Sequence, residues 1–353
     1  MRPEYPELTW DDVKEGDALG ELRYPISIKT LMLEIMGTRD FAPYHHNQAY
    51  TRARGIRDVF TNTMFYQGLF GRFTTDWSGP RSKIYSLDLH MRDQLCPGDV
   101  ALVTGTVASK LLEEDASTAH LDCRIVRGAR TVAKADVVMA MPRTCSDVVQ
   151  DQILTEESSV RPNPDMPEVA RQELARRTFR VSPYPVSEAQ IGYFCEMARD
   201  GNPRYTGDFH DAGDPVGGIT APPASLMIWC QSKATQDGLD ADHPDVDLAD
   251  EPAWPEAQTT RPFDFRFPGT SEVIVQHVRS EYGAPIRPGD RLSATSGIVD
   301  CSPRRETKLG PGYFVSYEEI FRNQRDEIVG KIVLDGLNYG LASHDAPDQE
   351  GSR

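Results

Sequence analysis

The stretch DVFTNTMFYQGLFGRFTTDW, residues 58–77, repeats apolar side chains at helical spacing. Its main apolar positions are Val59, Phe60, Met64, Phe65, Leu69, Phe70 and Phe73. Positions at this spacing cover much of the circumference of an α-helix. The stretch therefore predicts a central helix that is buried on most of its sides.

Four alternating runs follow this helix, separated by turn residues. They are KIYSLDLHMRD (83–93), DVALVTGTVASKL (99–111), TAHLDCRIVRG (118–128) and TVAKADVVMAM (131–141). Such alternation is typical of antiparallel strands with one face on a core. The second half has the same order, with PPASLMIWCQS (222–232) as the helix and runs at 272–286, 290–300, 314–324 and 327–340. The chain therefore predicts an α+β fold of two repeats, each an antiparallel sheet wrapped around a central helix.

Two short signals occur twice in the same order and support a duplication. The pattern Asp-x-x-Pro-x-(His or Tyr) occurs as DFAPYH at 40–45 and as DGNPRY at 200–205, 160 residues later. Pro-Gly-Asp occurs at 97–99 and at 288–290, 191 residues later. The second copy thus holds about 31 additional residues, and the polar stretch 235–260 is the predicted inserted loop.

These signals divide the chain into four predicted parts. A first repeat at 1–146 carries the candidate site, and a Pro-rich linker follows at 147–178, with PEVARQELARR as a short helix. A degenerate second repeat is predicted at 179–342. The polar residues 343–353 are predicted to be a disordered tail.

Composition argues against several classes of function. The net charge of −16 argues against nucleic acid and anionic membrane as partners, since both require a basic face. No apolar run approaches the roughly 20 residues of a membrane-spanning helix. The acidic N-terminus lacks the apolar segment of a signal peptide, so a cytoplasmic protein is expected. The cysteines have no Cys-x-x-Cys spacing, which predicts reduced thiols and neither a disulfide framework nor a zinc site: Cys96, Cys123, Cys145, Cys195, Cys230 and Cys301.

The stretch GTRDFAPYHHNQAYTRARG, residues 37–55, holds the candidate chemistry. Asp40 precedes His45 by five residues, and Pro43 between them fixes one backbone torsion and stiffens the loop. A histidine titrates near neutral pH and can act as acid or base, and a converging carboxylate can share one water with it. The alternative is an ordinary histidine of a polar surface loop. The aspartate partner and the ordered repeat favour catalysis.

The layout and this motif resemble the MaoC-like or hydratase 2 family of R-specific enoyl-CoA hydratases, in the double hot-dog form. The resemblance extends from about residue 10 to residue 342. The family motif Asp-x-Asn-Pro-x-His is matched by Asp40, Pro43 and His45, whereas Ala42 replaces its asparagine. It implies that Asp40 and His45 activate or deliver water that adds across a C=C bond conjugated to a thioester. It also implies that His46 is structural or exposed.

The same resemblance implies an oxyanion donor at the start of the central helix, where the family uses a backbone N–H. Asn62 and Thr63 stand in that place. The Thr63 N–H is the predicted donor, since the N-terminus of a helix offers free N–H groups whatever its side chains. Asn62 either orients the loop or is a helix cap, and both alternatives stay open. The segments NTMF (62–65) and TDWSGP (75–80) resemble the branch of the family associated with bulky, steroid-type acyl-CoA.

The second half differs from the motif at the position of the candidate base. Asp200, Asn202 and Pro203 are present, but Tyr205 stands where the histidine belongs, and tyrosine is a poor base at neutral pH. The stretch GGITAPPAS (217–225) resembles the non-catalytic repeat of double hot-dog hydratases. This half is therefore predicted to cover the exposed sheet edge of the first repeat and to help form the acyl pocket.

Coenzyme A requires basic residues near the site, and YTRARGIR supplies Arg52, Arg54 and Arg57. A solvated basic face is the alternative for each of them. Arg287 and Arg291 flank the second Pro-Gly-Asp turn and are equally undecided.

Together these features predict an R-specific 2-enoyl-CoA hydratase, equally a (3R)-3-hydroxyacyl-CoA dehydratase in reverse. No metal and no cofactor is expected beyond the coenzyme A thioester of the substrate. Three alternatives stay open: a hot-dog acyl-CoA thioesterase, a non-catalytic acyl-binding subunit of a hetero-oligomeric hydratase, and a small, branched, mesaconyl-like enoyl-CoA as substrate. A homodimer of double hot-dog units also stays open.

Overall fold

The structure is a computed structural model that describes residues 5–113, 116–174, 176–207, 218–231 and 267–340. The elements of the first half are η1 (Trp10–Asp12), β1 (Ala18–Pro25), α1 (Ile28–Thr38), η2 (Pro43–His45), α2 (Gln48–Ala53), α3 (Thr63–Ser78), β2 (Lys83–Met91), β3 (Val100–Leu112), β4 (Ser117–Arg127) and β5 (Arg130–Ala140). Those that follow are α4 (Glu168–Leu174), β6 (Thr178–Val181), α5 (Glu188–Ala198), α6 (Pro203–Thr206), η3 (Pro223–Ile228), β7 (Glu272–Tyr282), β8 (Ser293–Cys301), β9 (Arg305–Thr307), β10 (Gly310–Arg322) and β11 (Ile328–Tyr339).

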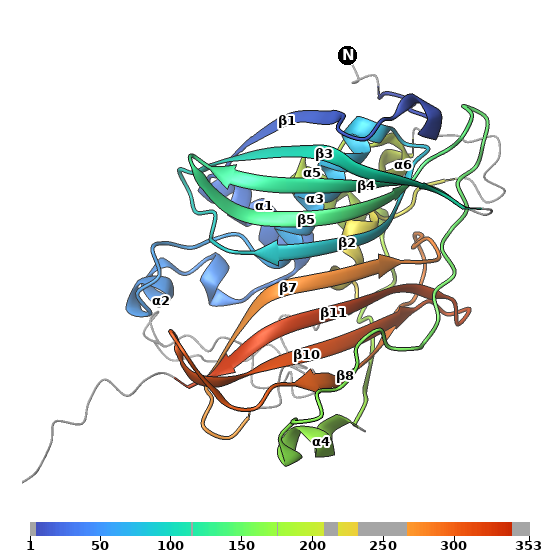
Figure 1. Cartoon of the computed structure of the whole chain (residues 1–353). Helices are drawn as coiled ribbons and strands as arrows, with labels where there is room; N and C mark the ends of the chain where they lie inside the picture. The colour runs from blue at the N-terminus through green and yellow to red at the C-terminus, as the bar shows by residue number, and fades with distance from the viewer. Residues whose placement is uncertain (1–4, 114–115, 175, 208–217, 232–266, 341–353) are drawn as a thin grey trace, which may run out of the picture.

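The strands form one antiparallel sheet that runs through both halves of the chain (Figure 1). Its order is β1-β3-β4-β5-β2-β7-β11-β10-β8-β6, and β9 pairs with β10 beside this path. The two halves join where β2 pairs with β7, in a ladder that runs from Ser86 opposite Glu281 to His90 opposite His277. We call this ladder the seam. The sheet confirms the predicted α+β fold of two antiparallel repeats.

The predicted central helix is α3. It begins at Thr63, because the Asn62 side chain caps it by accepting a hydrogen bond from the Phe65 N–H at 2.9 Å. Twelve of its 16 residues are buried, as a helix enclosed by a sheet and other helices requires. Two glycines allow close packing: a Cβ at Gly68 would lie 3.1 Å from a side chain of α5, and one at Gly71 would lie 3.1 Å from a side chain of η3.

Helices α1 and α5 were not predicted, and they are equivalent elements of the two repeats. Ser27 caps α1 and Ser187 caps α5, each accepting a hydrogen bond at 3.2 Å from the N–H three residues later. Each helix ends at an arginine in the left-handed conformation, with φ of 56° at Arg39 and 54° at Arg199. Both pairs are separated by 160 residues, the interval of the Asp-x-x-Pro motif. The duplication therefore extends to the helix caps.

The helix predicted at 222–232 is shorter and of another type than the central helix of the first repeat. Its described part is the 3₁₀-helix η3, because the Ser225 N–H and Oγ both bond to the Pro222 carbonyl, at 2.9 and 2.6 Å, and tighten the first turn. Helix α4 lies in the predicted linker, where the sequence predicts a short helix.

Two predicted segments, the inserted loop at 235–260 and the tail at 343–353, lie outside the described residues. Within the described ranges, no helix combines the length and the apolar character needed to cross a membrane.

Candidate active site

The loop after α1 brings the predicted acid–base pair together. Arg39 turns the chain out of α1, and Asp40 Oδ1 then accepts a hydrogen bond from the Ala42 N–H at 3.2 Å. Pro43 opens η2, in which the His45 N–H bonds back to the Ala42 carbonyl at 3.0 Å. These two turns place His45 Nε2 3.4 Å from Asp40 Oδ2.

The surroundings of His45 fix its protonation. Its Nδ1 lies 2.7 Å from the carbonyl oxygen of Phe60, which accepts hydrogen bonds only, so Nδ1 carries the proton of this bond. Burial alone lowers the pKa of His45, but the Asp40 carboxylate, Glu34 and the Phe60 carbonyl together raise that pKa to about 9. The raised pKa favours the protonated ring, in which the Nε2–H is directed toward Asp40.

Glu34 of α1 belongs to this cluster, although the sequence did not identify it. The side chain is fully buried, and Oε1 lies 4.0 Å from His45 Nδ1 and accepts a hydrogen bond from the Asn62 N–H at 2.6 Å. Burial raises its pKa to about 8, against the lowering effects of His45 and the Asn62 N–H. Oε2 has no hydrogen-bond partner in the part of the chain that the structure describes. The available signal was helical spacing, since Glu34 shares a helix face with the buried Leu31 and Thr38.

Asn62 fills both roles that the sequence left open. While Oδ1 caps α3 through the Phe65 N–H, Nδ2 donates to Asp40 Oδ2 at 3.3 Å and to Thr38 Oγ1 at 3.0 Å. The family motif has an asparagine where this chain has Ala42. Here the amide that reaches Asp40 comes instead from the N-cap of α3.

The predicted oxyanion donor lies at the start of the same helix. The Asn62 N–H is engaged by Glu34, and the Phe65 N–H is engaged by the cap. The N–H groups of Thr63 and Met64 are the donors of this first turn that neither the cap nor Glu34 engages. The geometry is compatible with the predicted role of Thr63, which stays a prediction.

The three predicted coenzyme A arginines have different surroundings. Arg57 forms an ion pair with Asp99 of the first Pro-Gly-Asp turn, and this hydrogen-bonded carboxylate raises its pKa. The Arg54 guanidinium lies 3.4 Å from the centre of the Tyr50 ring. Arg52 is exposed in the last turn of α2. Their role in binding coenzyme A stays a prediction.

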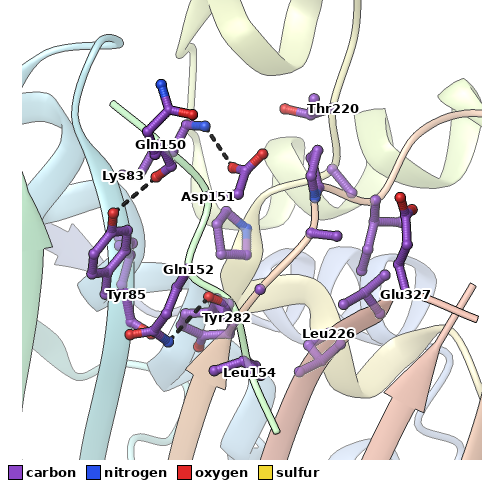
Figure 2. Close-up of a pocket in the computed structure, with 18 of the residues that line it drawn as sticks. Lys83, Tyr85, Gln150, Asp151, Gln152, Leu154, Thr220, Leu226, Tyr282 and Glu327 are labelled. Atoms are coloured by element: carbon purple, nitrogen blue, oxygen red, sulfur yellow. Dashed lines mark hydrogen bonds and ion pairs between the residues drawn. The ribbon is translucent and has the colours of Figure 1, made fainter. Parts of the chain in front are cut away.

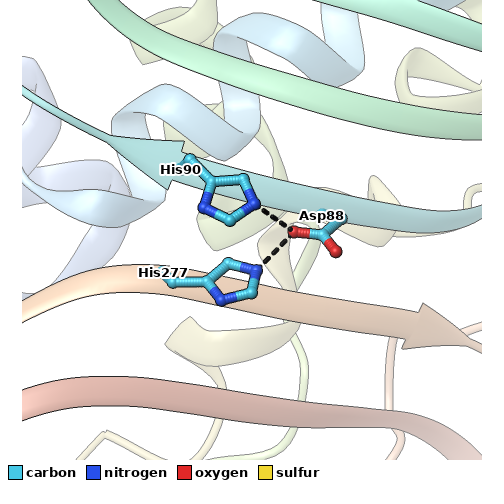
Figure 3. Close-up of side chains that lie close together, drawn as sticks. All are labelled: Asp88, His90 and His277. Atoms are coloured by element: carbon cyan, nitrogen blue, oxygen red, sulfur yellow. Dashed lines mark hydrogen bonds and ion pairs between the residues drawn. The ribbon is translucent and has the colours of Figure 1, made fainter. Parts of the chain in front are cut away.

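The described residues contain one His and carboxylate group compact enough for a metal ion: Asp88, His90 and His277, with candidate ligand atoms within 4.8 Å of one another (Figure 3). The two imidazoles stack across the seam, with ring centres 3.8 Å apart and planes 12° apart. A metal ion lies close to the plane of each imidazole that binds it, at about 2.0–2.1 Å from nitrogen. Two stacked, nearly parallel rings offer no such point without reorienting.

His277 is held at the seam by carboxylates on both sides. Its Nε2 lies 2.5 Å from Asp88 Oδ1, and its Nδ1 lies 2.8 Å from Asp335 Oδ2. Partial burial lowers the pKa of His277, but hydrogen bonds and charge from these two carboxylates raise that pKa to about 9. We interpret the group as a histidine paired with two carboxylates, those of Asp88 and Asp335, rather than as a metal centre.

The second repeat keeps the backbone of the site and lacks its reactive groups. Asp200 Oδ1 accepts from the N–H two residues later at 2.9 Å, as Asp40 does, and burial raises the Asp200 pKa to about 7. At the 160-residue interval, Tyr205 replaces the histidine, Phe194 replaces the buried glutamate, and Pro223 replaces the threonine of the predicted oxyanion donor. Because proline has no N–H, this repeat lacks the donor as well as the base.

Relatives of the chain are found by sequence and by structure, whereas no protein-family profile matches it. Over 94 residues it is 31% identical to the beta subunit of 3-oxo-4,17-pregnadiene-20-carboxyl-CoA hydratase from Mycobacterium tuberculosis, covering 27% of the chain and 73% of that subunit. Over 145 residues it is 28% identical to the alpha subunit from the same organism, covering 40% of the chain and 42% of that subunit. The chain thus matches less than half the length of the alpha subunit.

Two solved structures share the fold over almost their whole length. A MaoC domain protein dehydratase from Chloroflexus aurantiacus J-10-fl has a TM-score of 0.65 at 10% identity, covering 96% of this chain and 99% of that one. A conserved protein of Mycobacterium tuberculosis with a double hot-dog fold has a TM-score of 0.61 at 14% identity, covering 94% and 99%. At such identities these two structures establish the fold alone. The match to most of the beta subunit shows that the chain belongs to the hydratase family of that subunit, and the two structures show that it has the MaoC-like, double hot-dog fold.

Proposed function

We propose that the protein is an R-specific 2-enoyl-CoA hydratase, which also catalyses the reverse dehydration of a (3R)-3-hydroxyacyl-CoA. The observation that carries the proposal is the buried contact of 3.4 Å between His45 Nε2 and Asp40 Oδ2. Asn62 holds the carboxylate, and Glu34 lies on the other side of the imidazole.

The geometry suits an addition that requires a base for water and an acid for carbon. The Asp40 carboxylate takes a proton from water as the water oxygen bonds to the β carbon. The electron pair of the C=C bond moves into the thioester, and the resulting enolate oxygen is stabilised by the Thr63 N–H. His45 donates its Nε2 proton to the α carbon, and the proton on Asp40 then returns to His45. The sum is one added water and an unchanged enzyme.

The substrate we propose is a CoA thioester with a bulky, steroid-type acyl group. Both curated relatives are named for a pregnadiene-carboxyl-CoA hydratase, and this chain matches parts of both. No cofactor enters the proposed steps, because coenzyme A arrives as part of the substrate. Both relatives are also named as subunits, so we propose assembly beyond the single chain, with a homodimer as the simplest form.

The test is a hydration assay with short, medium and steroid-type 2-enoyl-CoA, followed by loss of the absorbance of the conjugated thioester. We expect His45→Ala to lower kcat/KM by about 10²- to 10⁴-fold, the usual contribution of an acid–base group. His46→Ala is the matched control and is expected to retain activity, because His46 is the adjacent, exposed histidine.

Three outcomes would contradict the proposal. Release of free coenzyme A without hydration would indicate a thioesterase. No reaction on any substrate, together with copurification of a second hot-dog chain, would indicate a non-catalytic subunit. Equal loss of activity in both histidine variants would remove the special role of His45.

A further inference from the structure

A cavity of about 1170 Å³ lies in the second repeat, next to the linker (Figure 2). Its walls come from linker residues 148–154, the start of β2, the end of β7, the start of η3 and the loops around them. Sites for small molecules have typical volumes of about 300–1000 Å³, so this cavity is large enough for a sizeable organic ligand.

Backbone hydrogen bonds show that this cavity is the counterpart of the candidate active site. In the first repeat the Phe60 N–H bonds to the carbonyl of Tyr44 at 3.2 Å. In the second, 160 residues later, the Thr220 N–H bonds to the carbonyl of Arg204, also at 3.2 Å. Thr220 and Arg204 both line the cavity.

The next residue repeats the correspondence. The Thr61 N–H bonds to the carbonyl of Leu95 at 3.0 Å, and the Ala221 N–H bonds to the carbonyl of Ile286 at 2.9 Å. Leu95 and Ile286 are 191 residues apart, the interval of the Pro-Gly-Asp turns. Ala221 and Ile286 also line the cavity, so it occupies the position in its repeat that the candidate site occupies in the other.

The lining is amphipathic and has an excess of positive charge. Four basic and two acidic residues line it, in a chain whose net charge is −16: Lys83, Arg204, Arg287 and Arg325, with Asp151 and Glu327. Lys83 pairs with Asp151, and Arg325 pairs with Glu327 and with Asp290, so part of this positive charge is neutralised within the protein. Apolar side chains from four elements form the remaining walls, among them Ile84, Leu226 and Val329. A ligand that suits this lining has a polyanionic end and an apolar body.

The linker forms a defined wall of the cavity. Lys83 Nζ contacts Asp151 Oδ1 at 2.5 Å, and the Tyr85 hydroxyl donates to the Gln150 carbonyl at 2.8 Å (Figure 2). Both bonds fasten linker residues to β2. The counterpart site is therefore enclosed by contacts of its own, although its catalytic groups have been replaced.

We propose that this cavity binds a second acyl-CoA molecule and holds it without converting it. The choice of acyl-CoA rests on the proposed function, whereas the preference for an amphipathic anion rests on the lining alone. No hydration is expected there, because Tyr205 stands in place of the histidine and Pro223 has no N–H to offer an enolate.

The test counts bound ligand by equilibrium dialysis, with saturated hexadecanoyl-CoA as the probe, since it has no C=C bond to hydrate. Wild type and His45→Ala are both expected to bind two molecules per chain. Thr220→Trp places an indole in the cavity, obstructs a bound acyl chain there, and is expected to bind one. Arg325→Glu is expected to weaken one of the two sites about tenfold, the effect of about 1.4 kcal/mol. Arg305→Glu makes the same charge change on exposed β9, outside the cavity, and is the matched control.

One molecule per wild-type chain, with no effect of Thr220→Trp or Arg325→Glu, would overturn the proposal. One molecule per chain together with a raised KM in Thr220→Trp would overturn it too, because the cavity would then be part of the substrate site. Arg325→Glu keeps the test valid if Thr220→Trp fails to fold. Two bound molecules in a protein that hydrates no enoyl-CoA would contradict the proposed function and leave the second site intact.

Discussion

Two substitutions of Asn62 separate its role as a helix cap from its role beside the proposed catalytic pair. Asn62→Ala removes three hydrogen bonds, to the Phe65 N–H at 2.9 Å, to Thr38 Oγ1 at 3.0 Å and to Asp40 Oδ2 at 3.3 Å. Asn62→Ser removes the last two and keeps a good capping residue. The two variants therefore differ mainly in the cap.

The expected magnitudes follow from these bonds. A lost N-cap costs about 1 kcal/mol, the lost neutral bond to Thr38 about 1 kcal/mol, and the lost bond to the Asp40 carboxylate about 1.5–3 kcal/mol. The free energy of unfolding should fall by about 3.5–5 kcal/mol in Asn62→Ala and by about 2.5–4 kcal/mol in Asn62→Ser. A hydrogen bond to a charged group contributes about 1.5–3 kcal/mol, so loss of the donor to Asp40 should lower kcat/KM about 10- to 100-fold in both variants.

Urea unfolding and the hydration assay measure the two effects separately. Equal stabilities of the alanine and serine variants would refute the cap contribution. Wild-type kcat/KM in Asn62→Ala would refute the argument that the amide orients Asp40. Activity restored in serine but not in alanine would mean that the cap alone supports catalysis.

Three further predictions concern packing, the second repeat and the seam. Gly37→Ala should destabilise the protein by about 1–3 kcal/mol in urea unfolding, because the added Cβ would lie 2.9 Å from a backbone oxygen of α5. Gly192→Ala on α5 is the control: its Cβ would meet nothing within 4 Å, so it should be neutral or stabilise the protein by up to about 1 kcal/mol. Tyr205→His should restore no hydration to an enzyme whose first site is inactivated, because Pro223 still lacks the N–H; measurable turnover would contradict this. Folding raises the pKa of His277 from 6.5 to about 9. The protonated side chain should therefore stabilise the folded protein by about 1 kcal/mol after solvent screening. This contribution should be complete below pH 6.5 and should be lost as the pH rises through about 9. Urea unfolding between pH 6 and 10 should show this slope in wild type but not in His277→Gln.

The sequence predicted those elements in which apolar side chains are buried and polar side chains are exposed. Strands β3, β4 and β5 alternate in burial much as their sequences alternate in polarity, and α3 is both apolar at helical spacing and buried. Helix α1 does the opposite, because it exposes Met32 and Met36 and buries Glu34. Its hydrophobic pattern therefore points away from the face that packs against α5, and pattern reasoning passes over it. β6 has four residues, two of them exposed and apolar, which is too short a run to recognise.

The part of the site that is formed by residues close together in the sequence was predictable. Asp40 and His45 meet because two turns within six residues bring them together, and a motif records such turns. The burial of Glu34 depends on packing between helices, and the ion pair of Arg57 with Asp99 joins segments 42 residues apart. Charged residues of this kind look solvent-exposed in a sequence, and their partners become visible when the fold is known.

The seam also has a consequence for how the chain folds without pairing with other chains. Each repeat, taken alone, would have β2 or β7 as an unpaired edge strand, whose free N–H and C=O groups can pair with another chain. Joining both repeats in one polypeptide makes the pairing of β2 with β7 intramolecular and therefore independent of the protein concentration. Self-association and mispairing are thereby suppressed during folding. The second repeat supplies the strand that pairs with β2 whatever side chains its own loops carry.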